Sequence, residues 1–444
     1  MPDHDTVRRP RRWVLWLLLA LSAALLAAAS WFCFTTHPKV AGLRNILAYK
    51  AVHRRGTPAV RAGALPGALS GTVRDDEGRP VAGAVVLVAS RLGHTFTSET
   101  GPDGTYAIGG LPPGRYVPVA AKRGYVDALP QRCLAGLCAK QARTIRPGRE
   151  VRAPGLTLAP EAPPRLMIDG SLVISPTQTV QTRAPLPGRA DRTRFSFERG
   201  GVRDAECFLY EPEGAAGPYP ALFQVLPGPV LNWEIVAVPF AAQGYSVLAC
   251  YPFRGTDIDG DVVDLLTALE YFRRGRLPSH ADLSRLGLIG ASWTSIHSYR
   301  LLETTEEFDV ALILGGLADA FAFRLASEQG TAYARPPFDQ VLMALGFPNT
   351  SPEQYFKFSV RYHLQDLPPL CLLHGTTDEL LPFEQSALLD QVLTRRGLEH
   401  RTFFYEGLTH YFSTSAEDAT TQQMFRDSLD CLGERLGTGA APAP

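Results

Sequence analysis

The sequence lacks any excess of charge, because its 444 residues include 44 Lys and Arg and 44 Asp and Glu. This balance produces no overall field favouring nucleic acid or an acidic substrate, so we expect no nucleic-acid partner. The sequence also lacks a CxxC pair and any cluster of His and Cys, the patterns typical of structural zinc sites. It therefore predicts neither a metal ion nor a cofactor.

One group of acidic residues invites a calcium interpretation. Asp257, Asp259, Asp261 and Asp264 do not fit the EF-hand spacing, because Gly260 precedes the third acid instead of following it. Carboxylates in a loop and in the first turn of a helix complement the positive end of the helix dipole. We therefore interpret these residues as the start of a helix.

Charged side chains are absent from residues 13–34, which follow four arginines at positions 8, 9, 11 and 12. A helix of this length reaches ~33 Å, enough to cross the hydrocarbon core of a bilayer. We interpret the segment as a retained membrane anchor, with the N-terminus in the cytoplasm and the bulk of the chain outside. The alternative is a cleaved secretory signal, with small residues at 27–29 as the cleavage site.

Seven cysteines are compatible with export. Cys133 and Cys138 flank a four-residue loop and are able to form a local disulfide in an oxidising compartment. Cys250 and Cys371 lie in apolar strands that are not expected to be neighbours. We therefore expect both of them to be inert thiols in the core.

Residues 66–158 alternate short apolar strands with turn signals, a rhythm that predicts a small β-sandwich. The pattern around residues 71–86, followed by Thr-x-x-Asp-Gly-x-Tyr and Leu-Pro-Pro-Gly-x-Tyr between residues 100 and 116, closely resembles the carboxypeptidase regulatory-like (transthyretin-like) domain. The resemblance implies a spacer or adhesive module without catalytic residues. We expect it to contact either the second half of the chain or the cell envelope.

Ser292 lies where an apolar strand over 286–290 meets the start of a helix near residue 295. A nucleophile elbow needs this strand–turn–helix context, with small neighbours such as Gly290 before the serine. The usual motif is Gly-x-Ser-x-Gly, and this chain has Thr294 at the last position. Partners further along the chain must therefore support the interpretation.

Two such partners follow in the expected order. Asp378 comes after an apolar strand at 370–374, and His410 comes after a strand at 401–405. The order Ser, Asp, His is typical of α/β-hydrolases. The chemistry needs all three, because a serine hydroxyl attacks well only when an imidazole oriented by a carboxylate accepts its proton. The other histidines considered fit less well: His297, His363 and His374.

The segments 344–346, 351–355, 359–364 and 372–378 make the second half resemble the prolyl oligopeptidase (S9) and dienelactone-hydrolase group of α/β-hydrolases. The resemblance implies that Ser292 is the nucleophile, Asp378 the orienting acid and His410 the general base. The β-propeller that gates true oligopeptidases has no counterpart in this sequence.

An oxyanion hole needs two N–H groups directed at the developing negative charge. We expect one from the backbone of Trp293 and one from the loop after the strand 221–226. Pro229 has no N–H, so Gly228 is the expected second donor. The side chain of Trp293 either lines the acyl pocket or belongs to the core.

The expected architecture is an α/β-hydrolase with a doubly wound, mostly parallel sheet, preceded by an N-terminal transmembrane helix and a small all-β sandwich domain. Aromatic residues of the lid (Phe321, Phe323, Tyr333, Phe338, Tyr355 and Phe356) either line a pocket or pack the lid onto the body. The expected boundaries are 1–35 for the tail and anchor, 36–65 for a juxtamembrane segment, 66–158 for the sandwich, 159–194 for a Pro-rich linker, 195–436 for the hydrolase with its lid at 317–366, and 437–444 for a tail.

Together these features predict a membrane-anchored, extracytoplasmic serine hydrolase. Its substrates are expected to be small peptides, amides or esters, cleaved through an acyl-enzyme. The alternative is a non-catalytic, surface-anchored binding or scaffolding protein with a degenerate hydrolase domain. Thr294 and Pro229, which depart from the usual motifs, are the reason for keeping that alternative.

Overall fold

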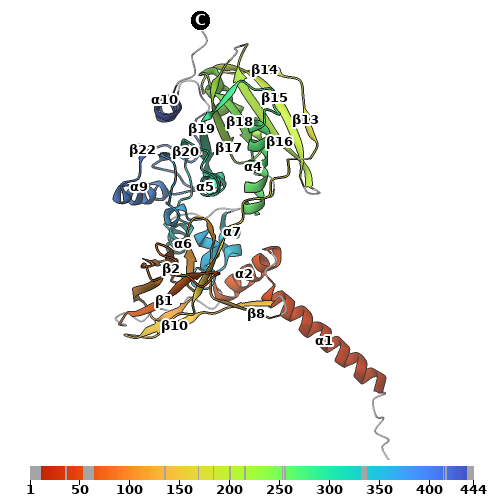
Figure 1. The fold of residues 1–444 in the computed structure, drawn as a ribbon, viewed down its shortest axis with the longest axis vertical. Helices are drawn as coiled ribbons and strands as arrows, with labels where there is room; N and C mark the ends of the chain where they lie inside the picture. Colours follow the sequence, from red (N-terminus) through yellow and green to blue (C-terminus); the bar gives the residue numbers. More distant parts are fainter. Residues whose placement is uncertain are drawn as a thin grey trace, which may run out of the picture. The chain divides into compact units, whose positions relative to one another are not determined.

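The computed structural model describes residues 12–35, 38–53, 65–134, 137–168, 170–183, 185–199, 202–214, 217–252, 254, 257–331, 338–413, 415 and 418–437 (Figure 1). By their contacts these residues divide into two compact units. The first unit comprises Met1–Ala120, Ala128–Thr157 and Pro336–Gln354. The second comprises Ala121–Asp127, Leu158–Arg335 and Tyr355–Pro444.

The first unit contains the predicted β-sandwich. Strand β1 (Gly67–Asp75) pairs antiparallel with β4 (Thr105–Leu111) and parallel with β11 (Glu150–Arg152). Alternate residues of β1 and β4 are buried, as expected for strands with one face on a core. The remaining strands between residues 65 and 160 are β2 (Val85–Ala89), β3 (Thr95–Glu99), β5 (Gly114–Tyr116), β6 (Val119–Ala121), β7 (Tyr125–Val126), β8 (Gln131–Leu134), β9 (Leu137–Lys140), β10 (Arg143–Ile145) and β12 (Leu156–Pro160). Of these, β7 and the last residues of β6 and β12 are assigned to the second unit.

Two N-terminal helices precede these strands: α1 (Arg12–Phe34) and α2 (Pro38–His53). In the part of the chain that the structure describes, no helix meets the length and hydropathy required to cross a membrane. The predicted transmembrane helix is therefore not established by the structure.

A segment of the expected lid belongs to the first unit. Helix α7 (Phe338–Leu345) packs on α2, where the Asn45 side-chain N–H donates to the Ala344 carbonyl at 2.7 Å. The rings of Tyr49 and Phe347 lie 5.9 Å apart, and Val117 N donates to Asn349 O at 3.1 Å. Residues 336–354 are therefore held by the same unit as the sandwich.

The second unit is built on a ten-stranded sheet. Its order is β13-β15-β16-β18-β17-β19-β20-β21-β22, and β14 also pairs with β15. All neighbouring pairs from β18 through β22 are parallel, and the pairs on the β13 side of β18 are antiparallel. The strands are β13 (Leu172–Ile174), β14 (Gln178–Thr182), β15 (Gly188–Arg199), β16 (Val202–Pro212), β17 (Tyr219–Val225), β18 (Ser246–Cys250), β19 (Ala281–Ala291), β20 (Val310–Leu314), β21 (Leu370–Gly375) and β22 (His400–Tyr405).

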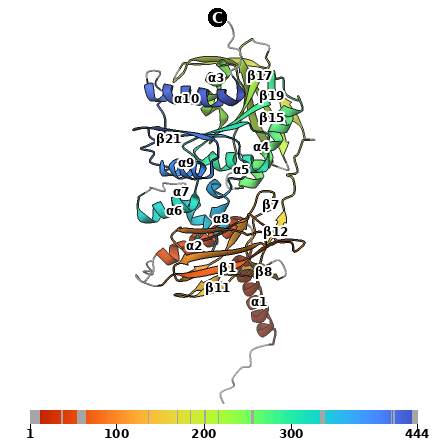
Figure 2. The same ribbon diagram turned by 60° about the vertical axis from the view of Figure 1, so that its left-hand side comes forward.

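Helices cover both faces of this sheet (Figure 2). Ile289 and Ala291 share a buried cluster with residues of α3 (Glu234–Ala242) and α10 (Ala419–Leu436). Gly290, which points the opposite way, packs against α5 (Ser295–Thr304). The other helices of this unit are α4 (Ile258–Arg273), α6 (Ala320–Gln329) and α9 (Glu384–Arg396), with short 3-10 turns η1 (Val230–Trp233), η2 (Ser292–Thr294) and η3 (Val360–Tyr362). The short helix α8 (Pro352–Phe356) begins in the first unit and ends in the second.

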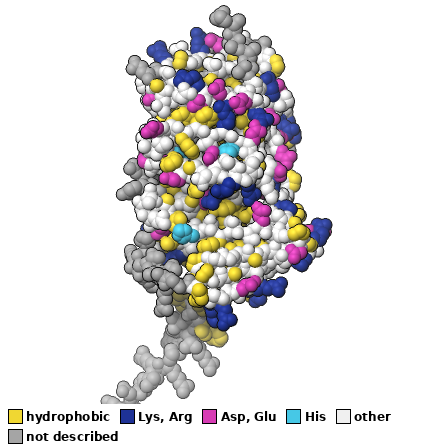
Figure 3. Space-filling model, turned by 90° about the vertical axis from the view of Figure 1, so that its left-hand side faces the viewer, with side chains coloured by type: hydrophobic (Ala, Val, Ile, Leu, Met, Phe, Trp, Pro, Cys, Tyr) yellow, Lys and Arg dark blue, Asp and Glu magenta, His cyan; other side chains and the backbone are white. Residues whose placement is uncertain are grey.

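This arrangement confirms the α/β-hydrolase sheet and refines its edge. Residues 188–199 and 202–212, at the expected start of the hydrolase domain, form the hairpin of β15 and β16. Residues 159–194, expected as a linker, contain β13 and β14, which both pair with β15. On the face shown in Figure 3, acidic and basic side chains are interspersed, in line with the balanced composition.

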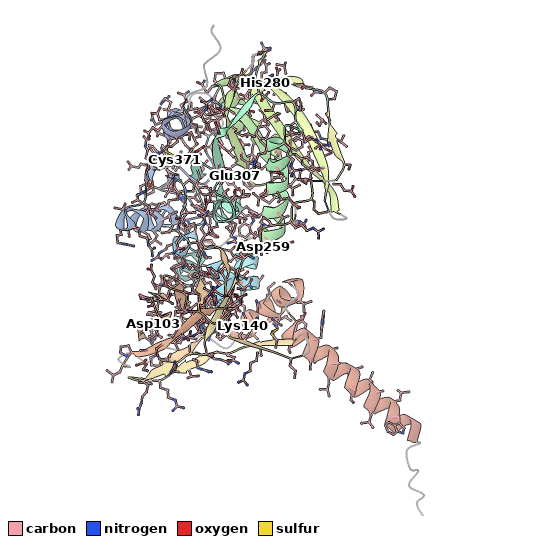
Figure 4. The ribbon with its side chains drawn as sticks, viewed as in Figure 1. Asp103, Lys140, Asp259, His280, Glu307 and Cys371 are labelled. Carbon is pink, nitrogen blue, oxygen red and sulfur yellow. A yellow bond between two sulfur atoms is a disulfide. The ribbon has the colours of Figure 1, made fainter. Side chains whose placement is uncertain are left out.

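Among the residues that the structure describes, six cysteines form three disulfides. Cys133 and Cys138 are bonded across the β8–β9 hairpin, as the sequence suggested. The expectation that Cys250 and Cys371 are inert thiols is wrong, because they are bonded to Cys207 and Cys431 respectively. Cys207 lies on β16 beside β18, and Cys431 lies on α10 against the sheet strand that carries Cys371 (labelled in Figure 4).

Candidate active site

Ser292 lies at the turn between β19 and α5 with a backbone φ of 49°. Left-handed backbone is costly for a residue with a side chain and persists where surrounding structure enforces it, often at active sites. The enforcement comes from close packing of strand and helix. A Cβ atom on Gly290 would lie 2.1 Å from the Ser298 Oγ, so only glycine fits before the turn.

Thr294 occupies the position where the usual motif has glycine, and it fits without strain. Its φ is −76°, in the right-handed helical region that any residue adopts. Its buried hydroxyl group lies 2.7 Å from both the Val225 and the Ala291 carbonyl oxygens, and its single proton is donated to one of them or shared between the two. The departure from the motif therefore adds a link from the elbow to β17 and leaves the turn intact.

Three residues from distant parts of the chain meet at this turn. Ser292 Oγ lies 2.8 Å from His410 Nε2, and His410 Nδ1 lies 2.8 Å from Asp378 Oδ2. Both distances are within hydrogen-bond range. The structure thus brings together the serine, imidazole and carboxylate that the sequence selected, in a linear relay.

Asp378 is held in its ionised form by its surroundings. Burial alone would raise its pKa, but hydrogen bonds with His374 and His410 and the N–H group of Leu381 outweigh burial and lower the pKa below its ordinary value. Leu380 N and Leu381 N donate to Oδ1 at 2.9 and 2.8 Å. A carboxylate that stays charged is what an imidazole needs to keep its Nδ1 proton and present Nε2 to serine.

His374 is a contributor that the sequence interpretation set aside. It is fully buried, and its Nε2 lies 3.3 Å from Asp378 Oδ2 and 2.8 Å from the Leu381 carbonyl oxygen. Its Nδ1 lies 2.7 Å from the Ser386 Oγ. The sequence feature that could have identified His374 as a partner of Asp378 is the His-Gly pair at the end of the strand before that residue. Of the other two histidines, His297 is buried with its Nε2 3.4 Å from Asp261 Oδ2, and His363 packs against Phe356.

The loops that carry Asp378 and His410 are tied together by hydrogen bonds from backbone and side-chain groups. Thr377 N and Thr377 Oγ1 donate to the Leu408 carbonyl at 3.1 and 3.0 Å. Gly407 N donates to Thr376 Oγ1 at 3.0 Å. His410 N donates to the exposed carboxylate of Glu379 at 3.1 Å. The position of His410 is therefore fixed by the Asp378 loop itself.

The loop expected to complete the oxyanion hole is shaped by Gly228 and Trp233. Gly228 has a φ of +80°, which favours glycine, and a side chain there would meet no atom within 4 Å. Trp233 Nε1 donates to the Pro227 carbonyl at 2.6 Å. In a trans peptide the Gly228 N–H points opposite that carbonyl, so Trp233 fixes the direction of the donor.

The aspartates that the sequence offered for a calcium site have structural roles in the second unit. Asp257 caps α4, Asp259 pairs with Lys357, and Asp264 holds Arg254 through two contacts of 2.7 and 2.9 Å. In the described part of the chain, no group of three or more His, Cys, Asp or Glu is placed to hold a metal ion.

Four of the aromatic residues expected in the lid are almost completely buried, so they pack the body of this unit: Phe321, Phe323, Tyr355 and Phe356. Tyr333 and the side chain of Phe338 lie outside the described residues. Trp293 is half-buried, with its ring 6.4 Å from that of Phe358.

The sheet order, the strained serine at the end of β19 and the relay to Asp378 define an α/β-hydrolase of the serine hydrolase type. Comparison of the sequence with known families agrees. Residues 68–132 match the carboxypeptidase regulatory-like domain, and residues 254–435 match the prolyl oligopeptidase family. The chain therefore carries a carboxypeptidase regulatory-like domain followed by a domain of the prolyl oligopeptidase (S9) family, which confirms both resemblances.

Solved structures of two kinds are similar. A thermophilic esterase from Thermogutta terrifontis is 17% identical with a TM-score of 0.44, and the match covers 55% of this chain and 93% of the esterase. An acylaminoacyl peptidase from Pyrococcus horikoshii is 14% identical with a TM-score of 0.46, covering 80% of this chain. This chain matches 62% of that peptidase, less than two thirds of its length. No curated protein matches the sequence.

Proposed function

We propose that this protein hydrolyses small peptides, amides or esters through an acyl-enzyme formed on Ser292. The observation that carries the proposal is the relay in which Ser292 Oγ lies 2.8 Å from His410 Nε2, itself 2.8 Å from Asp378 through Nδ1. A serine in this geometry has a base within reach of its proton, and the base has a partner that fixes its tautomer.

The reaction proceeds in two halves. His410 Nε2 takes the Ser292 hydroxyl proton as Oγ attacks the carbonyl carbon of the substrate. His410 then donates this proton to the leaving alcohol or amine, and the acyl group remains on Oγ. Water enters, gives its proton to His410 and attacks the acyl carbon, which releases the acid and restores Ser292.

The negative charge on the tetrahedral intermediate needs two N–H donors. We assign them to the backbone of Trp293, directly after the nucleophile, and to Gly228. The N-terminus of α5 begins at Ser295 and adds the positive end of its dipole to the same side of the turn. The bond from Trp233 to the Pro227 carbonyl supports this assignment, because it sets the orientation of the Gly228 peptide before substrate arrives.

The non-catalytic alternative has little support in the site. It was motivated by Thr294 and Pro229, and Thr294 fits the elbow with two hydrogen-bond acceptors in reach. Pro229 follows the proposed donor and does not replace it.

We further propose that the enzyme is membrane-anchored and acts outside the cytoplasm. Disulfides persist in oxidising compartments, and the six cysteines at 133, 138, 207, 250, 371 and 431 are paired. The charge-free run at 13–34 and exposed apolar side chains of α1 such as Trp16 and Leu26 support a lipid contact.

The localisation is tested by cell fractionation. The full chain should sediment with membranes and be accessible to protease on intact cells. Recovery in the soluble cytoplasmic fraction would rule the proposal out.

The catalytic proposal is tested by hydrolysis assays on a panel of p-nitrophenyl esters and aminoacyl p-nitroanilides. The parent should turn over at least one class, and Ser292→Ala should reduce kcat by roughly 10⁴-fold or more at unchanged fold. Circular dichroism of both proteins gives the control for folding. Equal residual rates in parent and variant would contradict the proposal.

A further inference from the structure

An apolar pocket lies beside the nucleophile, between the sheet and helices α3 and α10. Its wall includes Ala291, which directly precedes Ser292. It also includes Leu226, two residues before Gly228, and Phe412, two residues after His410. The segments of the nucleophile, of the proposed oxyanion donor and of His410 thus each contribute a wall residue.

The side chains that line the pocket favour a hydrocarbon group as the ligand. The two hydroxyl-bearing wall residues have partners within the protein: Ser428 Oγ donates to Met424 O at 2.7 Å, and Thr421 Oγ1 donates to Ser413 O at 3.2 Å. The other wall residues present carbon, apart from the Trp233 N–H, which is bonded to Pro227 O. A charged or strongly polar group would lose its hydration there without gaining a partner.

The size of the pocket limits what enters it. The cavity has a volume of about 40 Å³. A single water needs roughly 10–15 Å³ on the same measure, so the space fits a chain of about two to four carbons. Leu314 at the end of β20 is only partly buried, although β20 has a strand on each side. The pocket is thus a short apolar slot whose wall includes the ends of β19 and β20 at Ala291 and Leu314.

We propose that this pocket binds a short apolar substituent on the acyl carbon of the substrate, and so sets acyl-chain specificity. The inference rests on the proposed function. The acyl group is bonded to Ser292 Oγ from the first attack until water releases it as the acid. The alcohol or amine leaves with a proton from His410. An apolar pocket that begins at the residue before Ser292 suits the acyl group, because this group stays in place between the two half-reactions.

Two sources provide this chemistry: the alkyl tail of a short-chain ester, and the side chain of an aminoacyl group such as alanyl or valyl. The test uses p-nitrophenyl esters from acetate to decanoate, and alanyl, valyl and phenylalanyl p-nitroanilides. The parent should prefer acyl chains of about two to four carbons.

Leu314→Phe should fill the slot and lower kcat/KM for butyrate relative to acetate by roughly tenfold or more. Leu314→Ala should move the preference toward longer chains. Met424→Phe, from the opposite wall, should act like Leu314→Phe.

The matched control is Leu372→Ala, which truncates a fully buried side chain of the neighbouring strand β21 outside the pocket wall. It should leave the ratio of butyrate to acetate rates unchanged. A series of acetate esters with different alcohols should show no change in selectivity in the Leu314 variants. The pocket assignment is overturned if those variants alter the selectivity for the alcohol, or if they change kcat/KM by the same factor for every acyl chain.

Labelling of Ser292 with a small fluorophosphonate separates this inference from the proposed function. If the parent is labelled and active, but the Leu314 and Met424 variants keep its preference for acyl-chain length, the result contradicts the pocket assignment alone. A well-folded parent that is not labelled contradicts both.

Discussion

Gly375 lies against the loop of His410 so closely that a Cβ atom on it would be 2.1 Å from the Leu408 carbonyl oxygen. The obstacle is backbone, which cannot move aside like the end of a side chain. Leu408 O is also the acceptor for two donors of Thr377. The distance between the loops of Asp378 and His410 is therefore set by the absence of a side chain at residue 375.

Replacing this glycine should separate the catalytic loops. In Gly375→Ala the His410 loop must shift by an ångström or more, and a displacement of that size costs on the order of 10²-fold in rate. The measurement is kcat/KM on the best ester or amide substrate. Gly109→Ala is the control, because a Cβ there meets no atom within 4 Å. Equal rates for both variants and the parent would refute the role of this contact.

The hydroxyl group of Thr294 should stabilise the elbow. Thr294→Val keeps the shape but removes the donor to the carbonyl oxygens of Val225 and Ala291, and it should lower the free energy of unfolding by about 1–3 kcal/mol. Thr294→Ser retains the donor and should lose less. Urea denaturation at neutral pH gives both values. Identical losses for valine and serine would show that the hydrogen bonds contribute nothing.

Trp233 should act by positioning the oxyanion donor. Trp233→Phe keeps an aromatic side chain but loses the indole N–H that donates to the Pro227 carbonyl. The Gly228 N–H is then no longer held in place. We expect kcat to fall by roughly 10-fold or more while KM changes little, because the donor acts mainly on the transition state. Asn232→Ala, at an exposed neighbouring position, is the control. A rise in KM at unchanged kcat would point to substrate binding instead.

The lowered pKa of Asp378 makes a prediction about stability and pH. The folded protein favours the ionised form, so the stabilisation is present above the unfolded pKa of about 3.9 and is lost as pH falls through the lower folded value. Asp378→Asn should therefore be less stable than the parent by a nearly constant amount from pH 8 to 5. The gap should narrow below pH 4. A gap that stays constant to pH 2 would contradict this linkage.

Sequence patterns located the three residues that meet at the proposed site, because the position of each depends mainly on local sequence. A strand that ends at a small residue before Ser292, and loops after two apolar strands, place all three at one edge of a parallel sheet. The partner of Cys250 was not predictable in this way. It depends on the antiparallel pairing of β16 with β18, which joins residues about forty positions apart.

Two other features depend on contacts that no local pattern reveals. His374 was recognised as a strand-end residue, but its contact with Asp378 arises only when the loop folds back over it. The packing of α7 on α2 joins residues about three hundred positions apart in sequence, with Asn45 bonded to Ala344. Both are specified by complementary surfaces in the folded chain.

The most direct test of the account is whether Ser292 is an activated nucleophile. Parent protein and Ser292→Ala are treated with a fluorophosphonate probe, and the adduct is located by mass spectrometry of the digested protein. The account predicts one adduct, on Ser292 of the parent, and none in the variant. A folded parent without an adduct, or equal labelling of both proteins, would contradict it.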